Sequence, residues 1–241
     1  MSVSLGSLMY TIISRVILTI IILIIALPLS LCFLFGGTYI VDNKLFLLVQ
    51  RFFDWACVRL ALIPITYIGL ENLPPEPCIV VANHQSSFDI PLVGYILRKR
   101  PHIWIAWAEL TKGPLLRFLL PRIAVLVDVS SPTRAVRTLV KAINIVKAHP
   151  WDLVIFPEGA RHTDGKVHEF FGGFALIAKK INRSVVPVKI IGVNKVYPPK
   201  TFWMHRHPIT VIIGPTMMIG AEETEHEFKD RVYAWFVNTQ G

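Results

Sequence analysis

A histidine and an aspartate five positions apart are the first residues in this chain whose types and spacing suit catalysis. His84 and Asp89 lie in a polar segment that follows the apolar run Cys78–Ala82. If the residues between them form one helical turn, the Asp89 carboxylate can fix the imidazole tautomer and leave the other ring nitrogen free as a base. Histidine, with an ordinary pKa of about 6.5, suits proton removal from an alcohol at neutral pH. The alternative is structural: His84 caps a turn and Asp89 begins a helix.

A second polar segment follows another apolar run and suits anion binding. Residues Phe156–Arg161 come directly after Trp151–Ile155. Gly159 lets backbone amides approach an anion closely, and Arg161 offers two parallel donors that match a phosphate. Glu158 can orient that arginine or bind a substrate hydroxyl. The alternative is an ordinary tight turn with a surface salt bridge.

The elements that must position these segments alternate between strands and helices from about residue 64 onward. Several apolar runs are continuous, as expected for strands that are covered on both faces. We predict strands at Ile65–Ile68, Cys78–Ala82, His102–Ala106, Ala124–Val129, Leu153–Phe156, Val185–Ile191 and Thr210–Ile213. We predict helices at Thr133–Lys147, Phe170–Ile181 and Glu225–Val237, with Ser131 capping the first and Pro132 in its first turn. This alternation predicts an α/β domain with a mixed, largely parallel sheet covered by helices.

The N-terminal part of the chain predicts a membrane-embedded helical segment. Val16–Val41 is uncharged and longer than the roughly 20 residues that cross a bilayer core. A cleaved signal peptide would have an apolar core of only about 7–15 residues. Pro28 can kink this helix or turn it back, so a span and a hairpin both stay open.

A second apolar segment, Leu45–Ile63, follows the first. Lys44, Arg51 and Asp54 fall near one face, which predicts a helix in the membrane interface; a core helix of the globular domain is the alternative. Basic residues are more numerous after the first segment than before it, so the positive-inside rule predicts a catalytic domain in the cytoplasm. We expect residues 1–63 to form the anchor and residues 64–241 the catalytic domain.

The composition indicates a membrane protein that handles anionic ligands. Hydrophobic residues make up 53% of the chain and charged residues only 17%, whereas about 25% are charged in an ordinary soluble domain. The net charge of +9 favours anionic lipids or phosphorylated substrates, and the apolar excess argues against a nucleic-acid partner. Cys32, Cys57 and Cys78 have wide spacings, which predicts reduced, mostly buried thiols and no metal site.

Together and in this order, the two polar segments resemble those of the glycerophospholipid acyltransferase superfamily. Lysophosphatidic acid (1-acyl-glycerol-3-phosphate) acyltransferases are the most similar class. Asn83–Asp89 matches the N-H-x-S-x-x-D block of that family, and Phe156–Arg161 resembles its F-P-E-G-[T/S]-R block. Val185–Val188 resembles a later apolar block that contains proline. The resemblance extends from about residue 70 to about residue 214.

The resemblance implies a membrane enzyme of phospholipid biosynthesis. Such an enzyme transfers an acyl chain from acyl-coenzyme A or acyl carrier protein to the free hydroxyl of a lysophospholipid, and 1-acyl-glycerol-3-phosphate gives phosphatidic acid. His84 would deprotonate the hydroxyl and Asp89 would orient the imidazole, with no cofactor, no metal and no covalent acyl-enzyme. The expected substrate-binding residues are Asn83, Ser86, Lys112, Glu158, Gly159 and Arg161.

Three departures from the family pattern leave the acceptor open. The strand Ala124–Val129 lacks the terminal arginine that contacts phosphate, Trp107-Ala108 replaces a basic pair, and Ala160 replaces threonine or serine. Lys112, Arg122 and Arg134 are possible substitutes for the missing phosphate contacts. The alternatives are another lysophospholipid or aminolipid acceptor, or a non-catalytic membrane lipid-binding protein, which an intact His84–Asp89 pair disfavours.

Overall fold

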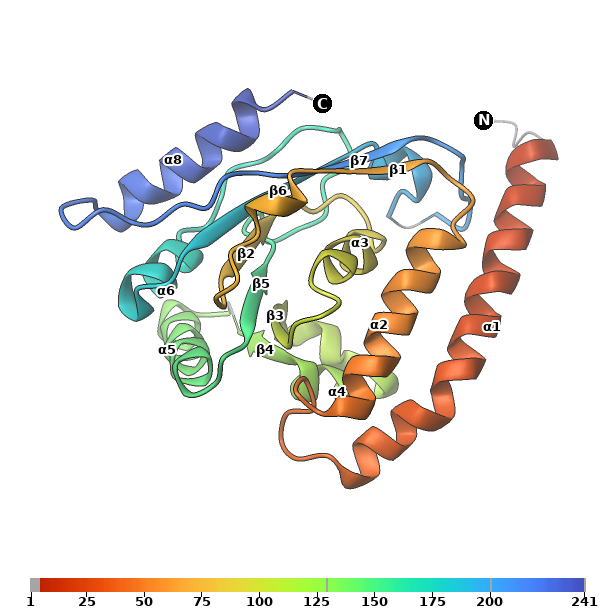
Figure 1. Cartoon of the computed structure of the whole chain (residues 1–241), viewed down its shortest axis with the longest axis horizontal. Coiled ribbons are helices and arrows are strands. Elements are labelled where there is room, and N and C mark those ends of the chain that lie inside the picture. The colour runs from red at the N-terminus through yellow and green to blue at the C-terminus, as the bar shows by residue number, and fades with distance from the viewer. Residues whose placement is uncertain (1–4, 129, 200, 241) are drawn as a thin grey trace.

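The computed structural model describes residues 5–128, 130–199 and 201–240, and these form a seven-stranded sheet between helices (Figure 1). The strand order is β1-β7-β6-β2-β5-β3-β4, and neighbouring strands are parallel except for the antiparallel pair β6 and β7. The strands are β1 (Ile65–Ile68), β2 (Ile79–Ala82), β3 (His102–Trp107), β4 (Ala124–Val127), β5 (Asp152–Ile155), β6 (Val185–Ile191) and β7 (Ile209–Ile213). The predicted α/β fold with a mixed, largely parallel sheet is confirmed.

The central strands are buried on both faces because helices cover both. Every residue of β2 and β5 is buried, whereas the edge strand β1 alternates between half-buried and exposed residues. The helices are α1 (Leu5–Phe35), α2 (Lys44–Arg59), α3 (Asp89–Ile96), α4 (Pro114–Ile123), α5 (Pro132–Ala148), α6 (Gly173–Ile181), α7 (Val193–Val196) and α8 (Glu225–Asn238), with short 3-10 turns η1 (Leu70–Asn72) and η2 (Ala108–Lys112). Helices α5, α6 and α8 share one core with the sheet, and α2 and α3 pack on the opposite face.

The predicted strands all occur: β1 and β6 have the predicted bounds, and the ends of the others differ by at most two residues. β4 ends at Val127, and Val129, the last residue of the predicted strand, lies outside the described residues. Ser131 caps α5 by accepting a hydrogen bond from the Arg134 amide, as its position predicts. We predicted no bounds for α4. Its sequence is mostly apolar and contains Pro121, so a regular helical pattern of apolar and polar residues is hard to recognise.

Helices α1 and α2 form an antiparallel hairpin along one side of the domain (Figure 1). Among the described residues, α1 is the one helix long and apolar enough to cross a membrane. It continues through Pro28 and ends before Gly36, where an added Cβ would collide with the Cys32 carbonyl. Leu23, Leu27 and other large apolar side chains on its outer face are exposed. The chain thus turns back between Phe35 and Lys44 and not at Pro28, and α2 packs against α1.

Polar side chains on the inner face of α1 attach it to the globular domain. The Thr11 hydroxyl accepts a hydrogen bond from the Met204 amide at 3.0 Å, and Arg15 donates to the same loop one turn later. At the other end of α1, Arg122 donates to the Phe33 carbonyl at 2.8 Å. The helix begins at Leu5, ahead of the predicted apolar stretch, because these polar residues have partners in the domain. It is therefore held against the domain at both ends.

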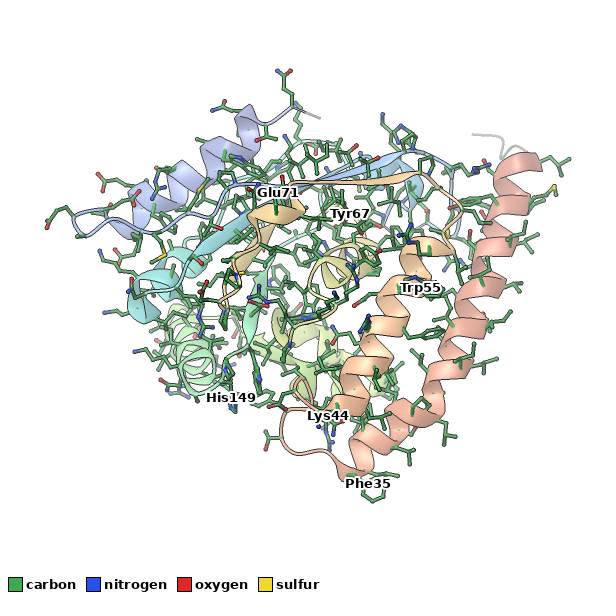
Figure 2. All side chains as sticks on the ribbon, in the orientation of Figure 1. Phe35, Lys44, Trp55, Tyr67, Glu71 and His149 are labelled. Carbon is green, nitrogen blue, oxygen red and sulfur yellow. The ribbon has the colours of Figure 1, made fainter. Side chains whose placement is uncertain are left out.

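Helix α2 lies between α1 and α3, which corrects the position expected for one of its charges. Asp54 was expected on a polar face with Lys44 and Arg51, but it is only 2% exposed and faces Gly94 of α3. Trp55, labelled in Figure 2, is 44% exposed on the same helix. One side of α2 thus belongs to the core, as in the alternative interpretation, and another side carries exposed aromatic surface.

Candidate active site

The loop after β2 brings His84 and Asp89 together at the carboxyl edge of the sheet. Asp89 is the first residue of α3, and its Oδ2 lies 2.8 Å from His84 Nδ1. The backbone amides of Gln85 and Ser86 donate to the same oxygen at 2.6 and 2.8 Å. A carboxylate can only accept, so Nδ1 carries the proton and Nε2 has the free lone pair. The two interpretations of this segment are compatible, since Asp89 both begins a helix and pairs with the imidazole.

Phe156 orients the imidazole from the neighbouring loop. Its ring stacks on that of His84 with centroids 4.1 Å apart and an interplanar angle of 13°. His84 is 18% exposed at its side chain, whereas Asp89 is fully buried. One face of the base is therefore covered by a hydrocarbon ring, and the sequence contains no signal for this contact beyond the presence of Phe156 in the second motif.

Glu158 connects the two polar segments through the backbone. Its Oε1 accepts a hydrogen bond from the His84 amide at 2.7 Å, and its Oε2 accepts one from the His168 amide at 2.8 Å. The side chain is 5% exposed, and this burial raises the pKa of the carboxyl while the two amides act in the opposite direction. Both oxygens thus have protein donors, which suits a residue that positions the His84 loop. Nothing in the sequence around His168 indicates that contact.

Gly159 is half-buried and Arg161 is exposed in the second motif. Gly159 has a φ of 68°, and a Cβ there would meet the rings of Phe171 and Trp107. A larger residue would therefore be both strained and crowded. Arg161 is exposed, and its Nη1 donates to the Ser87 hydroxyl at 2.7 Å, which links the guanidinium to the His84–Asp89 loop.

Two other expected substrate-binding residues point into the protein. The buried Asn83 side chain exchanges hydrogen bonds of 2.9 and 2.7 Å with the backbone of Ile190 in β6. The buried Ser86 hydroxyl donates to the Tyr197 carbonyl at 2.7 Å. Both residues hold the catalytic loop in place, and their polar groups have protein partners.

The basic residues considered as phosphate ligands have different surroundings. The Lys112 ammonium lies in η2, 79% exposed at the side chain and 3.6 Å from Glu109. Arg134 pairs with Asp128 at 3.0 Å, just beyond the end of β4. Arg122 precedes β4 and so lies at the amino edge of the sheet, opposite His84, which removes it as a substitute. Arg161, Lys112 and Arg134 are exposed cations at the carboxyl edge of the sheet, the edge that carries His84.

An apolar cavity of about 240 Å³ adjoins the catalytic loop. Leu18 and Ile21 of α1, Phe53 and Cys57 of α2, and Ser87 and Phe88 of the loop are among the residues that line it. It lies between the apolar hairpin and the loop that carries His84. Such a space suits part of a hydrocarbon chain.

These features define a class of enzyme. An imidazole oriented by a buried carboxylate, beside an exposed guanidinium and an apolar cavity, suits general-base transfer to a hydroxyl of an amphiphilic substrate. Comparisons with known proteins agree with this geometry. A sequence model described as Acyltransferase matches residues 64–191.

The chain is also similar to individual proteins. It is 30% identical over 196 residues to a 1-acyl-sn-glycerol-3-phosphate acyltransferase of Pseudomonas aeruginosa, covering 78% of this chain and 74% of that protein. It is 29% identical over 150 residues to a protein of the same description from Limnanthes douglasii, covering 62% and 53%. The crystal structure of the 1-acyl-sn-glycerophosphate acyltransferase PlsC from Thermotoga maritima superposes with a TM-score of 0.75 and 28% identity, covering 96% of this chain and 94% of that one. The chain therefore belongs to the acyltransferase family, which confirms the resemblance found in its motifs.

Proposed function

We propose that this protein transfers a fatty acyl chain from an acyl thioester to the free hydroxyl of 1-acyl-glycerol-3-phosphate and so forms phosphatidic acid. The observation that carries the proposal is the His84–Asp89 pair at 2.8 Å, in a chain of which 96% superposes on 94% of the PlsC chain. The similar proteins from Pseudomonas aeruginosa and Limnanthes douglasii are both described as 1-acyl-sn-glycerol-3-phosphate acyltransferases. The donor is an acyl-coenzyme A or an acyl carrier protein.

The reaction follows from the state of the imidazole. His84 Nε2 takes the proton of the acceptor hydroxyl while the hydroxyl oxygen attacks the thioester carbonyl. The carbon–sulfur bond breaks, the new ester forms, and the thiolate that leaves takes the proton from the imidazolium. The Asp89 carboxylate stabilises the imidazolium during this transfer. No side chain of the protein becomes acylated.

Arg161 is the residue best placed to bind the acceptor phosphate. Its guanidinium is exposed, and the Ser87 hydroxyl holds it beside the catalytic loop. The stretch Ala124–Val129 lacks the arginine with which the family pattern ends this strand, and this favours a second candidate acceptor, a lysolipid with a different headgroup. A panel of acceptors separates the two.

We place the outer face of α1 in the membrane, with the domain on the cytoplasmic side. Contacts at both ends of α1 hold it along the domain. If α1 crossed the bilayer perpendicular to the membrane plane, polar surface of the domain would therefore have to enter the hydrocarbon core. A position within one leaflet avoids that cost, and Lys44, Arg51 and Arg59 of α2 favour the cytoplasmic face.

Transfer of a labelled acyl chain from acyl-coenzyme A or acyl carrier protein to a panel of lysolipids tests the proposal. We expect His84→Ala to lower the rate by at least about 10²-fold, the lower end for loss of a general base. His226→Ala is the matched control, because His226 also pairs with an aspartate, Asp230, but on the surface of α8. Transfer by His84→Ala at the wild-type rate would eliminate the mechanism, and a preference for an acceptor without phosphate would favour the second candidate.

A further inference from the structure

The segment η2–α4 (residues 108–123) carries large apolar side chains that the protein core does not bury. Leu110, Leu115, Leu116 and Phe118 are 46%, 72%, 38% and 55% exposed. No described residue of α4 is buried, although a helix that connects two parallel strands ordinarily buries an apolar stripe. Exposed apolar surface of this kind indicates an interaction site.

The segment is net basic, with three cations and one acidic residue, Glu109, which lies 3.6 Å from Lys112. Between Leu110 and Val127 the sequence contains Lys112, Arg117 and Arg122 and no acidic residue. Lys112 and Arg117 are exposed beside the apolar side chains. Interleaved basic and apolar residues on a helix match the interface of an anionic bilayer, where the apolar groups enter and the cations meet phosphate.

The apolar surface of α4 is continuous with that of α1. The rings of Phe118 and Phe33 lie 4.8 Å apart, and the Arg122 guanidinium lies 5.3 and 5.2 Å from their centroids. Beyond Phe33, α1 ends with Leu34 and Phe35, which are 74% and 82% exposed; Figure 2 shows Phe35 at the lower end of the helix. A bilayer that contacts α1 at this end therefore also reaches α4.

The same segment begins at the edge of the active site. It follows Trp107, whose ring lies 3.4 Å from the position of a Cβ on Gly159. The ring of Phe171, which is 69% exposed, lies beside the same Cβ position. Apolar side chains thus continue from the second motif through η2 into α4.

We propose that η2–α4 is a second membrane contact, one that docks on anionic phospholipid and holds the catalytic edge of the sheet against the bilayer. A lysolipid can then reach His84 without leaving the membrane. This inference rests on the membrane position of α1 given under the proposed function, and it adds a separate, charge-dependent attachment.

Probes at three exposed apolar positions of the full chain test the proposal. Leu115→Cys on α4, Leu23→Cys on α1 and Val237→Cys on α8 are labelled with an environment-sensitive fluorophore, since the native cysteines are all buried. The protein is then added to vesicles of phosphatidylcholine with phosphatidylglycerol, with quencher atoms on the lipid chains. We expect quenching at Leu115→Cys and Leu23→Cys and none at Val237→Cys, which lies across the sheet.

The charge contribution is measured at the Leu115→Cys probe. Lys112→Gln and Arg117→Gln should each weaken docking of α4 about fivefold, and vesicles of phosphatidylcholine alone should weaken it further. The matched control is Lys229→Gln on α8, which should leave the signal unchanged.

The outcomes separate this inference from the proposed function. Quenching at Leu23→Cys without quenching at Leu115→Cys overturns the second contact and leaves the anchor intact. Loss of both signals removes the membrane position of α1 as well, while acyl transfer measured in detergent still tests the chemistry. Cross-linking of two copies through Leu115→Cys without lipid quenching would assign the patch to a second copy of the chain and also overturn the proposal.

Discussion

Two buried carboxylates at the site, Asp89 and Glu158, have different partners and therefore different roles. Asp89 Oδ2 accepts from the imidazole and from two backbone amides. Glu158 accepts from backbone amides only, one of them that of His84 itself. We therefore propose that Asp89 acts on the charge and tautomer of the His84 imidazole, and that Glu158 acts on the position of the His84 backbone.

Replacing Asp89 with asparagine tests the first role. The amide keeps the shape of the side chain but cannot stabilise an imidazolium, and its NH₂ group favours the wrong tautomer. We expect kcat to fall by about 10²–10⁴-fold, as for loss of general-base assistance. Asp230→Asn, which alters the surface pair with His226, should retain wild-type kcat. An equal effect of both substitutions would indicate loss of folding rather than loss of charge.

Replacing Arg161 with alanine tests phosphate binding. Loss of a hydrogen-bonded charge should raise KM for 1-acyl-glycerol-3-phosphate by about ten- to hundredfold, with a smaller effect on kcat. Ser87→Ala removes the hydrogen bond that holds the guanidinium and keeps its charge. Its effect on KM should be smaller. If Arg161→Ala raises KM for monoacylglycerol as much as for 1-acyl-glycerol-3-phosphate, Arg161 does not bind the phosphate.

At the scale of elements, α2 and α3 meet at a buried acid. Asp54 faces Gly94, and its Oδ2 has no hydrogen-bond partner among the described residues. Burial raises the pKa of the Asp54 carboxyl well above its ordinary value of 3.8. The neutral acid is therefore the form that fits this contact. Because α3 begins with Asp89, the contact also supports the catalytic loop.

The pH dependence of stability follows from that shift. The folded protein holds a proton on Asp54 that the unfolded chain releases above pH 3.8, so stability falls as pH rises from 3.8 towards the folded pKa. The slope is about 1.4 kcal/mol per pH unit in that window. Asp54→Asn should remove this slope in denaturant unfolding followed in detergent. Asp230→Asn is the control, and a slope that persists in Asp54→Asn would assign it to another group.

The α1–α2 hairpin, whose outer face we place in the membrane, is connected to the His84–Asp89 loop through the loop after α7. The amino end of α1 contacts the loop after α7, since Ser7 lies 3.0 Å from His205 Nδ1. Tyr197, at the start of that loop, accepts the hydrogen bond from Ser86. A shift of α1 relative to the domain would therefore move the loop after α7, which in turn contacts the His84–Asp89 loop through Ser86.

This arrangement predicts the topology of the N-terminus. Both ends of α1 should lie on the side of the membrane that carries the domain. A membrane-impermeant thiol reagent should therefore label Leu5→Cys and Val237→Cys from the same side, both being exposed positions. Labelling of the two from opposite sides would establish a transmembrane α1 and contradict the hairpin.

The strands, the long apolar N-terminal segment and the His84–Asp89 pair could be predicted from the sequence alone. Those features are local: periodicity sets an element, and the bend and turn that precede α3, in place of the helical turn expected from the sequence, bring His84 and Asp89 into contact. The other contacts of the site and of the hairpin join residues that are far apart in the chain, so they became visible only in the folded structure. Glu158 meets His84 across 74 residues, Thr11 meets Met204 across 193, and Asp54 turns inward because α3 covers it. Contacts at such separations depend on how helices and strands pack together, and a residue's neighbours along the chain do not record which distant element will cover it.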